Sequence, residues 1–160
     1  MKQNEENKGE PYLPQGKVYD LKISEKKGTA KKSTETALLI QDDGIQGDIH
    51  RGDSKRQVSF FTFEGMQKLE STEIKGLCTE RFWGNITTEG IQFSKLTAGT
   101  KLKIGETIIE ITNKGKKCFI ECELVQNGLN CTIPMETAFG KILKGGCIHI
   151  GDRIEVIKKD

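Results

Sequence analysis

The sequence lacks a charge excess of either sign, because its 25 lysines and arginines nearly balance its 23 aspartates and glutamates. A protein that binds nucleic acids through their phosphates normally carries a strong basic excess, so we expect no nucleic-acid partner. No apolar run approaches the roughly 20 residues that a membrane-spanning helix needs. The first residues are polar, unlike the apolar core of a signal peptide. We therefore expect a cytoplasmic protein without a membrane partner.

Motifs for nucleotide chemistry are also missing. The spacing Gly-x-x-x-x-Gly-Lys-Ser/Thr does not occur, and no Rossmann glycine pattern follows a predicted strand, so nucleotide hydrolysis and dinucleotide redox chemistry have no support. No two of the five cysteines form a Cys-x-x-Cys pair. An odd number of cysteines without a secretory signal disfavours a disulfide framework. Reduced cysteines can instead be buried small side chains, metal ligands or reactive thiols.

The length of 160 residues suits one compact domain with a real core. Residues 1–15 are polar and charged, contain Pro11 and Pro14, and show no periodicity, so we predict a mobile N-terminal arm. Residues 16–160 form the predicted domain.

Short strands dominate the predicted elements. Apolar and β-branched runs predict strands at 18–23, 37–40 and 57–63, and short helices are predicted at 64–71 and 135–143. Residues 102–111 and 148–157 share one pattern, in which a Gly-acid pair separates two apolar strands, and this pattern predicts two tight hairpins. We therefore predict a mainly β, barrel-like fold with a few short helices.

The strongest candidate for chemistry is Cys118, which directly follows Lys116 and Lys117. Nearby positive charge favours the thiolate, which is the form of cysteine that attacks and that binds metals. Glu121 and Glu123 flank Cys122 and disfavour its thiolate, so Cys118 is the better nucleophile.

Two other interpretations of the cysteines remain open. Cys118, Cys122 and Cys131 could hold a structural zinc ion, with His149 as the available fourth ligand. A single reactive Cys118 beside two structural cysteines is simpler. Outside this group, Cys78 and Cys147 are predicted to be buried small side chains.

Two polar segments could bind a ligand. In the first, Gly47, Asp48 and His50 precede Arg56, whose guanidinium suits bidentate phosphate recognition. The alternative is a turn in which Asp48 caps backbone amides and His50 is merely exposed. The second segment, residues 85–90, contains Asn85, Thr87 and Thr88, and is either a ligand-binding loop or a polar turn.

Six pieces of the sequence occur in an order that resembles the MOSC domain, the C-terminal domain of molybdenum-cofactor sulfurases. They are Gly44-Ile-Gln-Gly-Asp-Ile-His50, Arg56-Gln-Val-Ser59, Asn85-Ile-Thr-Thr-Glu-Gly-Ile91, Gly99-Thr-Lys-Leu-Lys-Ile-Gly105, Gly115-Lys-Lys-Cys118 and Phe139-Gly-Lys-Ile-Leu-Lys-Gly-Gly146. The likeness covers residues 16–157 and is closest to the small stand-alone bacterial members. It implies a MOSC-like β-barrel with a pocket for molybdenum cofactor (molybdopterin).

The resemblance also implies roles for individual residues. Cys118 matches the family cysteine that is proposed to carry sulfur as a persulfide or to ligate molybdenum, and Asn85 matches an asparagine that contacts the cofactor. The other implied cofactor-binding residues lie around them and supply hydrogen-bond donors and positive charge: Gly47, Asp48, His50, Arg56, Thr87, Thr88, Lys116 and Lys117.

Three departures from the family pattern stand out. Gly84 replaces the glutamate that usually precedes the asparagine, residues 51–55 lack a common histidine, and Phe119 stands where small relatives often have histidine.

The resemblance leaves three functions open. A sulfur carrier would take sulfur from a cysteine desulfurase or another donor and pass it to a molybdoenzyme acceptor, because this chain has no room for a pyridoxal-phosphate site. A molybdenum-dependent reductase of N-hydroxylated compounds would use an external flavin or iron-sulfur redox partner. The third possibility is a structural domain.

Overall fold

The structure, a computed structural model, describes residues 15–26, 32–70, 84–114 and 133–157. Its strands are β1 (Gln15–Ile23), β2 (Lys32–Thr34), β3 (Thr36–Ile40), β4 (Gly44–Ile45), β5 (Val58–Thr62), β6 (Ile86–Glu89), β7 (Lys101–Ile104), β8 (Thr107–Lys114), β9 (Thr137–Lys144), β10 (Gly146–His149) and β11 (Arg153–Ile157). The helical elements are α2 (Phe63–Glu70), the 3₁₀ turn η1 (Phe93–Lys95) and α5 (Ile133–Glu136). Among these elements, no helix is long and apolar enough to cross a membrane.

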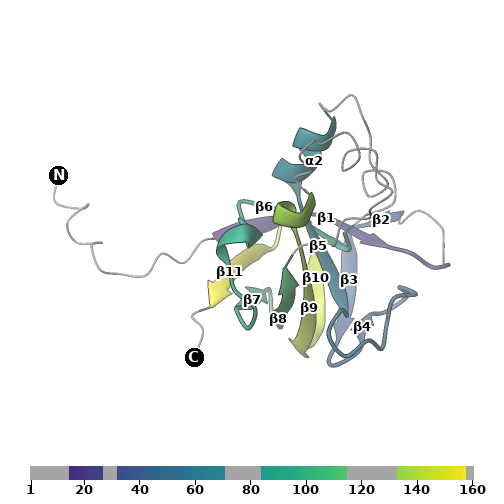
Figure 1. The fold of residues 1–160 in the computed structure, drawn as a ribbon. Helices are drawn as coiled ribbons and strands as arrows, with labels where there is room; N and C mark the ends of the chain where they lie inside the picture. Colours follow the sequence, from purple (N-terminus) through teal and green to yellow (C-terminus); the bar gives the residue numbers. More distant parts are fainter. Residues whose placement is uncertain (1–14, 27–31, 71–83, 115–132, 158–160) are drawn as a thin grey trace, which may run out of the picture.

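Seven strands close into a barrel, which confirms the predicted fold class. Their order is β11-β7-β8-β9-β5-β6-β1, and β1 pairs back onto β11 to close the ring (Figure 1). The β5–β6 pair is parallel, and the other pairs of the ring are antiparallel. Closure leaves the ring without an exposed strand edge.

The barrel interior is filled by alternate apolar residues of each strand, as the two-residue period of a strand requires. Leu21, Phe60, Ile86, Ile109 and Ile142 are each completely buried in it. All five residues of β5 are buried, so the predicted strand at 57–63 is central to the barrel.

The remaining elements cover the barrel. Strands β10, β3 and β4 form a separate three-stranded sheet. Helix α2 stands above the ring in Figure 1 and confirms the predicted helix at 64–71. Thr62 at the end of β5 links α2 to α5, because its hydroxyl donates to Glu136 Oε1 at 2.7 Å and accepts from the Gly65 N–H at 2.9 Å.

The predicted helix at 135–143 is wrong. Most of this segment is strand β9, in which Ala138, Gly140 and Ile142 face the interior and alternate with less buried residues. Gly140 allows the close packing there, since an added Cβ would lie 2.6 Å from Ile109. Strand neighbours on both sides decide the structure of this segment over its local helix preference.

One predicted hairpin is confirmed and the other is wrong. Strands β7 and β8 pair directly around Gly105, whose φ of +57° suits glycine at such a turn. Strands β10 and β11 belong to different sheets instead. The chain turns a corner at Gly151, whose N–H donates to the Val18 carbonyl of β1 rather than to β10.

Some predictions fall on residues that the structure does not describe. These are the arm up to residue 14, the stretch that holds Lys116, Lys117 and Cys118, and three further cysteines: Cys78, Cys122 and Cys131. Gln15, the last residue of the predicted arm, is the first residue of β1. Cys147 is described, and its predicted burial is wrong, because β10 turns this thiol outward and exposes it.

Candidate functional site

The candidate site is the outward side of five neighbouring barrel strands, which we call the outer face. Strand register and side-chain hydrogen bonds align one row of residues across β1, β6, β5, β9 and β8: Lys22, Asn85, Ser59, Phe139 and Asn113. A second row beside it contains Asp20, Thr87, Phe61 and Thr137. Their strand neighbours Leu21, Phe60, Ile86 and Ala138 point the other way, into the core.

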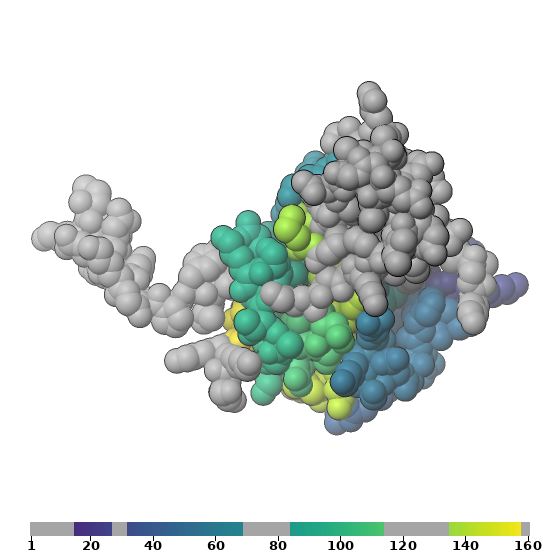
Figure 2. Space-filling view, viewed as in Figure 1, coloured from purple at the N-terminus to yellow at the C-terminus, as the bar shows by residue number. Residues whose placement is uncertain are grey.

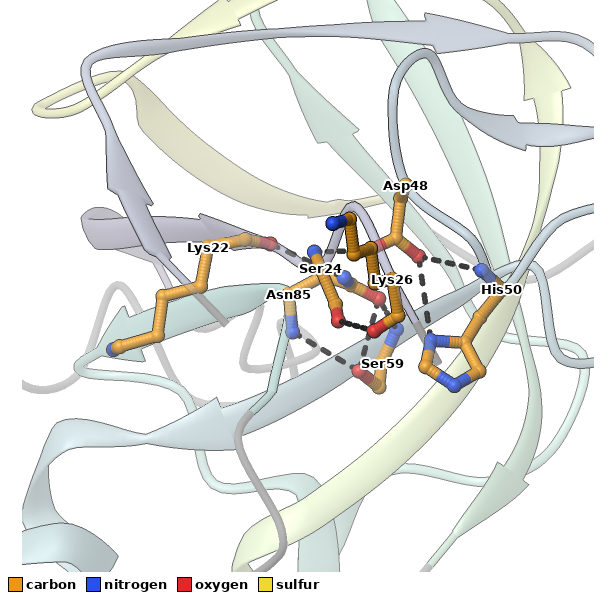
Figure 3. Close-up of polar contacts among 7 residues, drawn as sticks. All are labelled: Lys22, Ser24, Lys26, Asp48, His50, Ser59 and Asn85. Atoms are coloured by element: carbon orange, nitrogen blue, oxygen red, sulfur yellow. Dashed lines mark hydrogen bonds and ion pairs between the residues drawn. The ribbon is translucent and has the colours of Figure 1, made fainter. Parts of the chain in front are cut away.

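Asn85 is the structural centre of the outer face. Its Oδ1 accepts hydrogen bonds from the Ser59 N–H at 3.1 Å and from the Ser59 hydroxyl at 3.0 Å, and its Nδ2 donates to the Lys22 carbonyl at 3.1 Å (Figure 3). The Asn85 N–H donates in turn to Ser59 Oγ at 2.9 Å. Because the residue is only 3% exposed, these bonds lock β1, β5 and β6 together. The amide is therefore engaged by the protein itself.

Lys22 brings a largely buried positive charge to the same face, with its side chain 11% exposed. Its Nζ lies 2.8 Å from Asp20 Oδ2 and donates to Thr87 Oγ1 at 3.2 Å. An ammonium group has three N–H donors, so these described partners use two of them. Asp20 and Lys22, which alternate with apolar residues in this strand, are the sequence signal that could have identified this residue.

The Asp48 turn lies beside the end of β1. Asp48 Oδ1 accepts from the Ser24 N–H at 2.7 Å, and Oδ2 accepts from the His50 N–H at 3.1 Å (Figure 3). Gly47 supplies the positive φ of +88° that the turn needs. The Asp48 side chain is buried, whereas that of His50 is 58% exposed and its Nδ1 lies 3.7 Å from Asp48 Oδ2. Asp48 therefore makes the backbone contacts of the capping-turn alternative, and a ligand-binding role of this segment stays a prediction.

Arg56 is held at the rim of the outer face by its own loop. Asp53 Oδ1 accepts from the Lys55 N–H at 2.7 Å and the Arg56 N–H at 2.8 Å, and these bonds lower the pKa of Asp53. Buried Gln57 ties the loop to β9, because it donates to the Asp53 carbonyl and accepts from the Ile142 N–H. Residues 46–56 are exposed apart from Asp48, and the loop lies on the surface in Figure 2.

The Arg56 guanidinium lies over the Phe139 ring, with its central carbon 4.9 Å from the ring centroid. This is a cation–π contact, which orients the side chain without using its N–H donors. The described residues place no carboxylate within ion-pair distance of the guanidinium. An exposed guanidinium held in this way is suited to receive an anion.

The predicted loop at 85–90 is mostly strand β6, so its amides serve the ladders to β1 and β5 rather than a bound phosphate. Thr87 lies on the outer face. Thr88 faces the barrel interior, where its Oγ1 is buried without a hydrogen-bond partner in the described part of the chain. The N–H of Gly90, which ends the segment, donates to Glu64 Oε2 at 2.9 Å.

Asn113 is a site residue that the sequence did not reveal. It lies opposite Phe139 in the β8–β9 register, just after a bulge at Thr112. Its Oδ1 is buried, and no described residue donates to it. A buried amide oxygen without a donor is costly, and it marks a position where a ligand can supply one. Only the strand register shows that Asn113 shares a face with Asn85.

The family model of the MOSC domain matches residues 46–155 of the chain. This chain belongs to the MOSC domain family. The matched region includes Asp48, Arg56, Asn85 and Asn113, whereas Lys22 precedes it. A search of curated proteins returned no significant match.

Solved structures share the fold of this MOSC protein. The YuaD protein from Bacillus subtilis aligns with a TM-score of 0.69 at 17% identity, over 91% of this chain and 97% of that chain. YiiM from Geobacillus stearothermophilus aligns with a TM-score of 0.63 at 11% identity, over 89% and 75% of the two chains. YiiM from Escherichia coli aligns with a TM-score of 0.57 at 16% identity, over 94% and 72%.

Gly84, which replaces the usual MOSC glutamate, is packed against β5. A Cβ at this position would lie 2.8 Å from the Phe61 nitrogen and 2.9 Å from the Phe61 Cβ. Any side chain would therefore push on the backbone of a central strand. Glycine at position 84 is therefore suited to the close packing against Phe61 in this chain.

The described residues contain no cluster of candidate metal ligands. Within residues 15–26, 32–70, 84–114 and 133–157, no group of three or more histidine, cysteine, aspartate or glutamate side chains is arranged to hold a metal ion. Lys116, Lys117 and the sulfur atoms of Cys118, Cys122 and Cys131 lie outside these ranges.

Proposed function

We propose that this MOSC protein binds a molybdenum-cofactor-type pterin on its outer face, with Cys118 carrying sulfur as a persulfide or ligating molybdenum. Family membership supports the cofactor class, because the MOSC family is associated with the molybdenum cofactor. One juxtaposition carries the proposal. The Arg56 guanidinium lies over Phe139, and Asn113 is the partner of Phe139 in the strand register. Neither the guanidinium nor the buried Asn113 oxygen has a polar side-chain partner among the described residues.

The described residues fit both ends of a molybdopterin. Its phosphate suits the Arg56 guanidinium, which is exposed and is held over the Phe139 ring. Its pyrimidine edge carries N–H donors, which the buried Asn113 oxygen is able to accept. The Phe139 ring offers an apolar surface for a flat ring system. When bound, the cofactor supplies a redox-active metal whose soft chemistry favours a thiolate ligand.

Cys118 follows the last residue of β8 by four positions in the sequence. Lys114, the last residue of β8, pairs with Ala138 of β9, next to Phe139. Four residues of fully extended chain span at most about 14 Å, so the Cα atom of Cys118 lies within that distance of the Cα atom of Lys114. This limit is compatible with a Cys118 thiol that acts at the part of the barrel where Arg56 and Asn113 lie.

The carrier role is a sulfur transfer between thiols. The Cys118 thiolate attacks the terminal sulfur of a persulfide on a cysteine desulfurase, the donor's S–S bond breaks, and the donor cysteine leaves as a thiolate. Cys118 is left with a persulfide, and no external oxidant is needed. Lys116 and Lys117 favour the thiolate on which the step depends.

Mass spectrometry tests the carrier role directly. The protein is incubated with a cysteine desulfurase and cysteine, and added sulfur is mapped on peptides of the wild type and of Cys118→Ser. We expect one added sulfur on Cys118 and none at this position in the variant. Sulfur distributed equally over the other cysteines, with none on Cys118, would contradict the carrier role.

The reductase alternative makes a different prediction. In a molybdenum-dependent reductase of N-hydroxylated compounds, Cys118 holds the metal and a separate protein supplies electrons. Protein purified anaerobically after expression with molybdate would then contain molybdenum, and Cys118→Ser would lose it. Reduction of 6-hydroxylaminopurine with a chemical electron donor would select this alternative, whereas metal-free protein that still accepts sulfur would exclude it.

A further inference from the structure

A second thiol site lies on β10, outside the outer face. Cys147 and His149 are two residues apart on this strand and are both exposed, because they share the side opposite buried Ile148. The distance from Cys147 Sγ to His149 Nε2 is 3.9 Å. Strand β10 pairs on one side with β3, and it is an edge of the three-stranded sheet.

Asp152 positions the imidazole from the other side. Its Oδ2 accepts the backbone N–H of His149 at 2.8 Å and lies 3.6 Å from the ring Nδ1. A carboxylate facing Nδ1 favours the tautomer that carries its proton there, which leaves Nε2 as an acceptor directed at the thiol. Cys147 as nucleophile, His149 as base and Asp152 as orienting carboxylate therefore lie next to one another, which is the arrangement that activates a nucleophilic side chain.

Two carboxylates lie near this end of β10, and one of them is beside the imidazole. On β3, the residues opposite Cys147 and His149 are Leu38 and Thr36, which carry no charge. From the β7–β8 turn, the Glu106 side chain lies against Gly146. Glu106 lies on the side of β10 that Gly146 shares with Ile148, opposite Cys147 and His149, so the carboxylate beside the imidazole is that of Asp152.

We propose that Cys147 is a thiol–disulfide exchange site, modified by low-molecular-weight disulfides, with His149 as its base. His149 Nε2 takes the thiol proton, and the Cys147 thiolate attacks one sulfur of the disulfide. The disulfide's S–S bond breaks, a mixed disulfide forms on Cys147, and the departing thiolate takes the proton from His149. The small disulfide is the oxidant, so the exchange is balanced.

The proposal does not depend on cofactor binding, because none of these three residues belongs to the outer face. An exposed thiol at a sheet edge is open to a small disulfide from solvent, and 56% of the His149 side chain is also exposed. Within the described part of the chain there is no second cysteine to resolve the mixed disulfide.

The test measures the rate at which each cysteine of the full-length protein reacts with hydroxyethyl disulfide at pH 7, by quenching and peptide mass spectrometry. In His149→Gln, we expect the rate at Cys147 to fall at least about tenfold, since the base is lost. Asp152→Asn is expected to give a smaller decrease. His50→Gln is the matched control, because His50 is also exposed and also faces an aspartate.

A pH profile separates base catalysis from a structural effect. Between pH 6 and 8 the wild-type rate at Cys147 is expected to level off, whereas that of His149→Gln should keep rising with pH as for a simple thiol. Equal rates at Cys147 in wild type and His149→Gln would overturn the proposal. So would an equal decrease at every cysteine of His149→Gln, or an equal decrease at Cys147 in His50→Gln.

Discussion

Replacing Asn85 with alanine is the sharpest test of how the outer face is built. The substitution removes Oδ1, which accepts from the Ser59 N–H at 3.1 Å and from the Ser59 hydroxyl at 3.0 Å. It also removes Nδ2, which donates to the Lys22 carbonyl at 3.1 Å. The hydroxyl is free to rotate toward another acceptor, but the Ser59 N–H and the Lys22 carbonyl cannot move without disturbing β5 and β1.

The expected loss in the free energy of unfolding follows from the Ser59 N–H and the Lys22 carbonyl, which both lose their partner. A buried polar group that loses its partner costs about 1–3 kcal/mol, so Asn85→Ala is expected to lower the free energy of unfolding by about 2–4 kcal/mol. That is a large fraction of the total stability of a domain, which is about 5–15 kcal/mol. Urea denaturation followed by circular dichroism measures the change.

The control is Asn113→Ala, which makes the same truncation at an amide with no hydrogen bond to a described side chain. We expect it to cost less than about 1 kcal/mol, because no paired group loses its partner. A double-mutant cycle of Asn85→Ala with Ser59→Ala should give a coupling of about 1 kcal/mol. If Asn85→Ala is as stable as Asn113→Ala, Asn85 is not the structural centre of the face.

Three further predictions concern positions around the site. Gly84→Ala should lower the free energy of unfolding by about 1–3 kcal/mol by calorimetry, because its Cβ would press on Phe61; an unchanged melting temperature would contradict the packing argument. Asp53 should titrate below the ordinary aspartate range in NMR, because the Lys55 and Arg56 N–H groups bind its ionised form. Its contribution to stability is therefore present above the ordinary aspartate pKa and is lost as the pH falls through the lowered value, whereas Asp53→Asn should remove this dependence. Thr62→Val should cost about 1–3 kcal/mol in urea denaturation, because the Gly65 N–H loses its acceptor; a neutral effect would show that the hydroxyl does not hold α2.

The sequence predicted those parts of the fold that depend on local pattern. The run at 57–63 is rich in β-branched and aromatic residues and forms the buried strand β5, and the Gly105 turn forms a hairpin. Segments with ambiguous local pattern were predicted wrongly. Residues 135–143 have no strong alternation of polar and apolar types, and β8 and β5 on either side make them a strand.

Strand geometry decides which of the predicted site residues share the outer face. Successive residues of a strand face opposite sides, so Thr87 and Thr88 cannot both contribute to one face of β6. Lys22, Ser59 and Asn113 are distant from each other in sequence, and only the pairing of five strands brings them into one row. No local motif carries that information.

The contacts also divide the matched MOSC residues into two kinds. Asp48 and Asn85 are buried and bonded to backbone groups of other segments, so they build the site. The Arg56 guanidinium and the Asn113 Oδ1 have no hydrogen bond or ion pair with a described residue, so the proposed function assigns them to the ligand. Substitutions of the first kind should affect folding, whereas those of the second kind should affect binding.

The pterin content of charge-reversed variants tests the central claim most directly. Arg56→Glu and the control Arg153→Glu are purified anaerobically beside the wild type after expression with molybdate, and bound pterin is quantified by fluorescence after oxidation. Arg153 is exposed on β11, outside the outer face, and pairs with Glu155 at 3.6 Å. We predict that Arg56→Glu loses the pterin while Arg153→Glu retains it. Equal pterin content in the two variants, or none in the wild type, would contradict the account.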